Sequence, residues 1–218
     1  MTQKIIVTND GSHSVLVSAI NESYHSKHGA IAEAKHVFIK NGLLSANKKN
    51  ITILEVGFGT GLNTLLSYQN SNQKDIAIDY HTIEPYPIKK DTYTLLNFPD
   101  LIGEKKDVFF KLHNSKWEFK NQITKNFYLT KHNVSLQNYN THKKFDVIYF
   151  DAFSPNKQPD LWTESILKKI HSKLKDDGFL ITYCAKGTFR RTLKKIGFNV
   201  VSLDGPPGKR QITRANRR

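Results

Sequence analysis

Cysteine, long apolar runs and acidic residues are all scarce in this sequence. Its single cysteine, Cys184, excludes an intramolecular disulfide framework and a zinc site built on cysteines, and it fits a reducing compartment. No segment approaches the roughly 20 apolar residues of a membrane span, and the first residues lack the apolar core of a signal peptide. We therefore expect a cytoplasmic protein without a membrane partner.

The scarcity of acidic residues leaves a large positive charge. The 218 residues contain 33 lysines and arginines against 19 aspartates and glutamates, a formal net charge of +14 at pH 7. Such an excess makes polyanions, above all nucleic acids, the first candidates as partners. Lysine and asparagine are frequent throughout the chain. The alternative to a polyanionic partner is therefore that compositional drift has placed part of this charge on solvent-exposed surfaces. The 38% of hydrophobic residues is enough for one folded core.

Strand and helix patterns alternate from residue 51 onward and predict an α/β fold with a mostly parallel sheet. Apolar or β-branched runs predict strands at 51–56, 76–83, 145–150, 179–184 and 198–203, and amphipathic stretches predict helices at 62–69, 161–174 and 188–196. Ahead of them, β-like runs at 5–8 and 14–18 flank the turn Asn9-Asp10-Gly11, and 29–40 is typical of a helix. We therefore expect a hairpin and helix extension over residues 1–50, packed on a core of residues 51–218.

A glycine-rich loop follows the strand predicted at 51–56. Gly57, Gly59 and Gly61 alternate with other residues, and Glu55 comes just before them. A dinucleotide loop would need a glycine where Leu62 stands, and the lysine of a P-loop is missing. A carboxylate at this place would repel a pyrophosphate, so the loop suits a cationic ligand. A glycine turn without any ligand is the alternative.

A second motif follows the strand predicted at 145–150 and covers residues 151–162 (DAFSPNKQPDLW). Ligands of parallel sheets bind beyond the carboxyl ends of the strands, so we expect Asp151 to face the ligand. Phe153 offers a hydrophobic face, with core packing as the alternative. Asp160 is predicted to cap the helix that follows.

The two motifs resemble class I S-adenosylmethionine-dependent methyltransferases, and more narrowly the tRNA 5-methylaminomethyl-2-thiouridine methyltransferases. The narrower resemblance rests on residues 24–39 (YHSKHGAIAEAKHVFI), 55–63 (EVGFGTGLN), 151–162 and 205–210 (GPPGKR), in order along nearly the whole chain. It implies a Rossmann-like fold, S-adenosylmethionine as cofactor, and methylation of the primary amine of 5-aminomethyl(-2-thio)uridine at the tRNA wobble position. The length resembles the stand-alone type, which implies a separate oxidase acting upstream.

The resemblance also implies roles for single residues. Glu55 would serve the amino end of the cofactor, Glu84 its ribose hydroxyls and Asn133 its adenine amine, a polar loop residue being the alternative for Asn133. Asp151 and Phe153 would be catalytic, the first holding the amine and the second stacking on the wobble base. The full set expected at the cofactor is Glu33, Glu55, Gly57, Phe58, Gly59, Gly61, Asn63, Glu84, Asn133 and Asp151, with a solvated helix position as the alternative for Glu33.

The tRNA anticodon loop is the partner that the resemblance implies. Its phosphates are expected to meet Lys157, Lys186, Arg190, Lys209 and Arg210, around a locally acidic crevice, with a solvated helix face as the alternative for Lys186 and Arg190. The histidines of residues 24–39 lack a convergent acid pair, so no metal is expected. Two other functions are weighed. The first is a methyltransferase or aminopropyltransferase-like enzyme acting on another amine. The second is an RNA-binding domain without a cofactor, against which the intact glycine loop argues.

Overall fold

Two β-sheets organise residues 3–217, the part of the chain that the computed structural model describes. The larger sheet has the strand order β10-β11-β9-β8-β4-β5-β7-β6, and the smaller has the order β1-β2-β3. The strands are β1 (Gln3–Val7), β2 (His13–Val17), β3 (Glu22–Ser23), β4 (Asn50–Val56), β5 (Ala77–Ile83), β6 (Lys120–Thr124), β7 (Phe127–His132), β8 (Phe145–Phe150), β9 (Leu174–Thr182), β10 (Asn199–Asp204) and β11 (Gln211–Asn216).

The centre of the large sheet is parallel. β4 pairs in parallel with β5 and β8, and these strands pair in parallel with β7 and β9. Antiparallel strands extend both edges, β6 at one and the β11–β10 pair at the other. From β4 the chain adds β5, β6 and β7 on one side of the sheet. It then returns to β8, on the other side of β4, and adds β9, β10 and β11 there. Such a reversal places the ligand site at the carboxyl ends of β4 and β8, and the predicted α/β fold with a mostly parallel sheet is confirmed.

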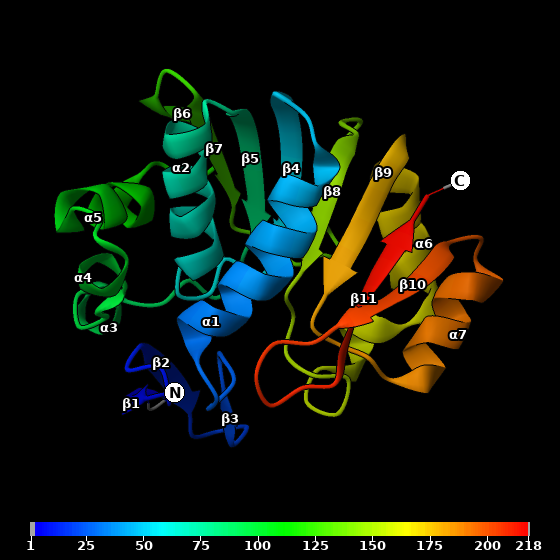
Figure 1. Ribbon diagram of the computed structural model, residues 1–218, viewed down its shortest axis with the longest axis horizontal. Helices are drawn as coiled ribbons and strands as arrows, with labels where there is room; N and C mark the ends of the chain where they lie inside the picture. Colours follow the sequence, from blue (N-terminus) through cyan, green and yellow to red (C-terminus); the bar gives the residue numbers. More distant parts are fainter. Residues whose placement is uncertain (1–2, 218) are drawn as a thin grey trace.

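Helices cover both faces of this sheet (Figure 1). Phe38 and Leu65 belong to the hydrophobic cluster on one face, and Ile170 and Leu193 to the cluster on the other. The helices are α1 (Ala30–Ala34), the π-helix η1 (Lys35–Leu43), the 3-10 helix η2 (Leu44–Ala46), α2 (Leu62–Lys74), α3 (Lys90–Tyr93), α4 (Phe98–Ile102), α5 (Lys106–Asn114), the 3-10 helix η3 (Pro159–Trp162), α6 (Glu164–Lys173) and α7 (Gly187–Lys195).

The N-terminal hairpin expected from the turn at residues 9–11 is present, since β1 and β2 pair antiparallel. Its turn residues cap α1. The carboxylate of Asp10 accepts a hydrogen bond from the amide of Ala32 at 2.9 Å, and the hydroxyl of Ser12 accepts one from the amide of Ala30 at 3.2 Å. The first amides of a helix have no partner inside it, so these bonds fix the start of α1. Figure 1 shows the small sheet beside the carboxyl ends of the parallel strands.

The helix after motif residues 151–162 begins later than the sequence pattern predicts. Asp160 lies in η3 and does not cap α6, which corrects that expectation. Thr163 is the cap instead, because it keeps extended backbone angles and its hydroxyl accepts a hydrogen bond from the amide of Ile166 at 3.5 Å. The intervening 3-10 turn separates Asp160 from the free amides of α6.

The last described residues form β11, a strand that the sequence pattern does not predict. Its polar composition conceals the alternation, because Ile212, Thr213 and Ala215 are buried while Gln211 is exposed. β11 inserts between β9 and β10, so the C-terminal segment belongs to the sheet instead of trailing into solvent.

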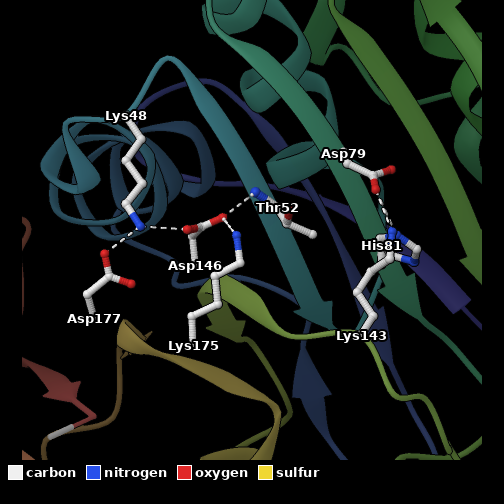
Figure 2. Close-up of polar contacts among 8 residues, drawn as sticks. All are labelled: Lys48, Thr52, Asp79, His81, Lys143, Asp146, Lys175 and Asp177. Atoms are coloured by element: carbon white, nitrogen blue, oxygen red, sulfur yellow. Dashed lines mark hydrogen bonds and ion pairs between the residues drawn. The ribbon is translucent and has the colours of Figure 1, made fainter.

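An ion network joins β4 and β8 near their amino ends (Figure 2). The carboxylate of Asp146 accepts hydrogen bonds from the ammonium groups of Lys48 and Lys175, both at 2.7 Å, and from the amide of Thr52 at 2.8 Å. Burial acts to raise the pKa of Asp146, but the bonds from both lysines hold it below its ordinary value of 3.8. The network therefore fixes β4 beside β8 at the end of the sheet opposite the ligand site.

Within residues 3–217, no helix has the length and apolar character needed to cross a bilayer. The same residues hold no group of three histidine, cysteine or acidic side chains placed to bind a metal ion. The thiol of Cys184 is buried and packs in the hydrophobic cluster that contains Ile170.

Candidate active site

The glycine loop joins the carboxyl end of β4 to the start of α2. Gly57, Gly59 and Gly61 have positive φ angles of 95°, 50° and 76°. A Cβ on Gly57 would lie 2.8 Å from the carbonyl oxygen of Asp151, and one on Gly59 would lie 2.9 Å from the ring of Tyr24. Because both the backbone angles and the space exclude a side chain, only glycine fits these positions. The loop therefore brings β4 directly against the end of β8.

A cavity of about 780 Å³ opens beside this loop. Its walls come from the glycine loop, the ends of β5 and β8, the segment around β3, and the loop before β11. This volume is that of a small-molecule site. The expected site residues on its lining are Glu33, Gly57, Phe58, Gly59, Asn63, Glu84, Asp151, Phe153, Lys157 and Lys209.

Asp151 follows β8 and lies on the cavity lining next to α2. The side-chain amide of Asn63 donates a hydrogen bond to its Oδ2 at 2.8 Å. Burial raises the pKa of Asp151 to about 7, a rise that Asn63 and Lys209 oppose and the negative charge of Glu33 strengthens. Near neutral pH the group is therefore divided between acid and carboxylate, and it is able to exchange a proton with an amine.

Glu55 lies beneath the loop, fully buried and outside the cavity lining. Its Oε2 accepts a hydrogen bond from the hydroxyl of Thr64 at 3.1 Å, while Oε1 has no partner among the residues that the structure describes. Burial raises the pKa of Glu55 to about 8, and the nearby charge of Asp151 adds to the rise. A buried oxygen without a donor is unfavourable, so a donor from a ligand or a water molecule would stabilise this position.

Glu84 follows β5 and holds the glycine loop from the other side. Its carboxylate accepts hydrogen bonds from the amides of Tyr86 at 2.9 Å and Gly59 at 3.0 Å. Burial raises the pKa of Glu84, and these two bonds oppose the rise. Each carboxylate oxygen keeps a second lone pair. Glu84 is therefore fixed in place and still able to accept hydrogen bonds from a diol.

Aromatic and charged side chains from the N-terminal extension and from the segments after β8, after β9 and before β11 converge on the same cavity. Tyr24 and Phe153 meet edge to face, with ring centres 5.2 Å apart and planes at 63°. Lys209 forms an ion pair with Glu33, and its ammonium lies 4.2 Å from the ring centre of Tyr183. The N-terminal extension, the loop after β8 and the loop before β11 thus meet around one space.

A family model for S-adenosyl-L-methionine-dependent methyltransferases matches residues 105–218. The chain belongs to this family. The methyltransferase is 30% identical over 211 residues to the tRNA 5-methylaminomethyl-2-thiouridine biosynthesis bifunctional protein of Marinomonas sp. (strain MWYL1), covering 88% of this chain and 31% of that protein. It is 27% identical over 219 residues to an uncharacterised protein of Methanocaldococcus jannaschii, covering 97% of this chain and 58% of that protein. It therefore spans about a third of the bifunctional relative.

The fold of the methyltransferase matches the crystal structure of MNMC2 from Aquifex aeolicus with a TM-score of 0.80 and 23% sequence identity. The match covers 100% of this chain and 70% of that one. The Rossmann-like methyltransferase fold that the sequence resemblance implies is confirmed, and the N-terminal hairpin and helix are included in the match.

S-adenosylmethionine is the cofactor of this family, and the cavity residues fit it. The cofactor carries a sulfonium and an ammonium group, which carboxylates attract, and Glu84 and Asp151 both lie on the lining. Gly57 and Gly59 leave room for close approach to the backbone. The free lone pairs of Glu84 are acceptors for the hydroxyl donors that a ribose supplies.

Gly61 and Asn133 lie outside the cavity lining of the methyltransferase. Gly61 precedes α2 with the left-handed backbone that starts the helix. The side-chain amide of Asn133 donates to the carbonyl oxygen of Glu84 at 2.9 Å, and its backbone amide donates to Glu118 at 2.7 Å. Asn133 thus braces the turn after β5, and its contact with the adenine stays a prediction.

The basic residues expected at RNA divide into two groups. Arg190 donates hydrogen bonds to Gln211, Ile212 and Thr213 at 2.9–3.0 Å, so its guanidinium holds β11. Lys186 and Arg210 lie in a shallow depression next to the cavity. Lys209 lines both the depression and the cavity, and Lys157 lines the cavity alone. Their contacts with RNA stay predictions.

Sequence reasoning missed Tyr24, His25 and Tyr183. His25 is half-buried and shares a hydrogen bond with Thr60 at 3.2 Å. Desolvation lowers the pKa of its imidazole to about 4, so the ring is neutral at pH 7. Tyr24 and His25 begin the matched segment 24–39, which is a usable signal. Tyr183 follows β9 as Asp151 follows β8, so the strand-end argument that selected Asp151 applies to it as well.

Lys131 is a further residue that no sequence signal indicates, because a lysine in a strand is usually exposed. Its side chain is fully buried, with the ammonium 5.4 Å from the ring centre of Phe58 and 4.6 Å from that of Trp117. The ammonium also donates a hydrogen bond to the carbonyl oxygen of His113. Burial lowers the pKa of Lys131 to about 8. These contacts hold Phe58 in place on the cavity lining.

Proposed function

We propose that the methyltransferase methylates the primary amine of 5-aminomethyl(-2-thio)uridine at the wobble position of tRNA. The observation that carries this function is Asp151, a carboxyl group with a pKa of about 7 on the lining of the cofactor cavity, oriented by Asn63. Such a group suits an amine that must lose a proton. The relatives support the nucleoside, because the protein of Marinomonas is named for the biosynthesis of tRNA 5-methylaminomethyl-2-thiouridine.

The residues around Asp151 are suited to orient an amine and to stabilise its positive charge. Bound S-adenosylmethionine supplies the methyl carbon, to which the amine nitrogen bonds as the carbon–sulfur bond breaks and its electron pair stays on sulfur. An alkylamine is mostly protonated at neutral pH, and only the neutral form has a lone pair for this bond. Asp151 accepts an N–H hydrogen bond, which directs the lone pair toward the methyl carbon, and then stabilises the ammonium product. Phe153 offers a ring face on which the base stacks.

The proposed partner is the anticodon loop of tRNA. Lys157 and Lys186 are exposed, and each is oriented by one hydrogen bond, to the carbonyl oxygen of Ile20 at 2.8 Å and to Asn156 at 2.6 Å. Together with Arg210 they provide cations for phosphates at the mouth of the cavity and in the adjoining depression. The same proposal includes a separate oxidase upstream that supplies the primary amine.

The test compares two tRNAs that differ only at the wobble position. One carries 5-aminomethyluridine and the other carries uridine, and both are incubated with the protein and labelled S-adenosylmethionine. We expect label only in the first, with mass analysis of the digested nucleosides showing a gain of one methyl group on the aminomethyl nitrogen. Equal labelling of both tRNAs contradicts the substrate. Labelling of a free polyamine in the absence of tRNA would favour another amine acceptor.

A further inference from the structure

The Glu33–Lys209 ion pair lies on the cavity lining, and its two members come from opposite ends of the chain. Glu33 belongs to α1 and is 12% exposed, while Lys209 belongs to the loop between β10 and β11 and is 28% exposed. The other carboxylate oxygen of Glu33 accepts a hydrogen bond from the amide of Ser26 at 3.4 Å. The ammonium of Lys209 is held over the ring of Tyr183 at 4.2 Å. Both charges are therefore oriented by the fold before any ligand binds.

Both members of the pair act on the group that faces the methyl acceptor. The charge of Glu33 raises the pKa of Asp151, and the charge of Lys209 lowers it. An amine bound at Asp151 would be subject to the same two charges, since a carboxylate favours its protonated form and an ammonium disfavours it. Because the two effects have opposite signs, the intact pair leaves Asp151 as the dominant charge near the amine.

We propose that the Glu33–Lys209 pair sets the protonation state of the methyl-accepting amine, with Lys209 as a positioning residue that cancels the charge of Glu33. This inference rests on the proposed function, because it requires an amine acceptor. With the pair intact, the N–H bond of the bound ammonium breaks, its electron pair stays on nitrogen, and the proton passes through the carboxylate of Asp151 to water, which leaves Asp151 ionised beside the amine. Without Lys209 the amine would face two carboxylates and keep its proton.

Other titratable groups surround this corner of the cavity. They are Glu22 of β3, Tyr24, His25, Lys27 and His28 before α1, Glu55 of β4, Glu84 and Tyr86 after β5, Lys157 and Asp160 after β8, and Tyr183 and Cys184 after β9. Burial raises the pKa values of Tyr183 and Cys184, so both are neutral near pH 7. Glu55 is also coupled to Asp151, whose charge raises the pKa of Glu55 to about 8. Glu33 and Lys209 are the charges on the cavity lining that shift the pKa of Asp151, which is why the pair is the place to test.

The test measures kcat against pH for E33Q, K209Q and the double variant, on tRNA carrying 5-aminomethyluridine and with saturating cofactor. We expect K209Q to move the acidic limb of the profile to higher pH by about one pH unit and E33Q to move it to lower pH. The double variant should return close to the wild-type limb, and K209R should restore it as well. If the pair only holds the two segments together, E33Q and K209Q would both lower kcat without shifting the acidic limb of the profile in opposite directions. That result overturns the proposal.

An ion pair outside the cavity lining is the control. Glu164 of α6 and Lys195 of α7 form an ion pair at 2.7 Å, so E164Q and K195Q change the net charge in the same way and should leave the limb in place. Circular dichroism of every variant reports whether it is folded.

A measurement without tRNA separates this inference from the proposed function. Carbon-13 NMR titration of the Asp151 carboxyl, assigned by comparison with D151N, should show its pKa raised in K209Q and lowered in E33Q. Unchanged values overturn the inference even if tRNA is methylated. The expected values together with no methylation of either tRNA overturn the proposed function alone.

Discussion

The side-chain amide of Asn63 donates a hydrogen bond to Oδ2 of Asp151 at 2.8 Å and so ties the first turn of α2 to the end of β8. The backbone ties the end of β4 to the same place, because the amide of Asp151 donates to the carbonyl oxygen of Val56 at 3.1 Å. The glycine loop lies between these two contacts. The glycine loop, which we propose binds the cofactor, and the carboxyl group proposed to bind the amine are therefore fixed to each other.

Replacing Asn63 by alanine should slow methyl transfer and change its pH dependence. The hydrogen bond from Asn63 stabilises the carboxylate form of Asp151, so its loss raises the pKa of Asp151 and moves the acidic limb of the kcat profile to higher pH. Loss of a charge-assisted hydrogen bond predicts a fall in kcat at pH 7 of about tenfold to 100-fold. Asn70→Ala is the control, since Asn70 lies on the same helix and donates to the carbonyl oxygen of Leu66 instead. An unshifted limb in Asn63→Ala would contradict this role.

Replacing Asp151 by asparagine should separate turnover from cofactor binding. The amide neither accepts a proton nor stabilises an ammonium, so we expect kcat to fall about 100-fold or more. The glycine loop and Glu84 are untouched, so the dissociation constant of S-adenosylmethionine, measured by calorimetry, should change far less than kcat does. If cofactor binding falls in proportion to kcat, Asp151 is a cofactor ligand instead of the group that serves the acceptor.

Replacing Gly57 by alanine should weaken both the fold and the cofactor site. The residue has a φ of 95°, and its new Cβ would lie 2.8 Å from the carbonyl oxygen of Asp151, so the end of β8 must move. We expect a loss of about 2 kcal/mol in the free energy of unfolding and weaker binding of S-adenosylmethionine by calorimetry. Gly103→Ala is the matched control, with a φ of 69° and no atom within 4 Å of its Cβ. If Gly57→Ala and Gly103→Ala weaken cofactor binding equally, backbone strain alone accounts for the weaker binding and the contact with Asp151 does not.

Replacing Asp146 by asparagine should destabilise the protein in a pH-dependent way. Its carboxylate, 2% exposed, binds two ammonium groups, and loss of that charge should lower the free energy of unfolding by about 2 kcal/mol at pH 7. Since the folded-state pKa lies below the ordinary 3.8, this stabilisation is present above pH 3.8 and is lost as the pH falls through the folded-state value. Urea unfolding at pH 7 and pH 3 should therefore show the difference from wild type narrowing. Asp177→Asn, at a side chain 67% exposed, should have little effect at either pH.

Local patterns in the sequence were sufficient for the features that depend on neighbouring residues. The strand before Asp151 and the strand before Glu84 are short apolar runs ended by an acid, so their carboxyl ends and the polar residues there are visible without a structure. Long-range contacts were not visible in this way. The cap of α6 at Thr163 instead of Asp160 depends on a 3-10 turn, and β11 depends on a vacant edge of β9 that a polar segment fills.

The sequence by itself determined the alternation of strands and helices, the glycine loop and the resemblance to methyltransferases, because each depends on residues that are contiguous in the chain. Only the tertiary structure decided what each charge faces. Lys209 and Arg210 are adjacent and equivalent as sequence, yet Lys209 pairs with Glu33 inside the cavity while Arg210 is exposed. The reason is packing between distant segments, since the backbone of Gly208 lies so close to His28 that a Cβ would come within 2.3 Å of its ring. The Lys209 side chain that follows lies between Glu33 and the ring of Tyr183, so the excess of positive charge includes a cation that pairs with a carboxylate of the protein itself.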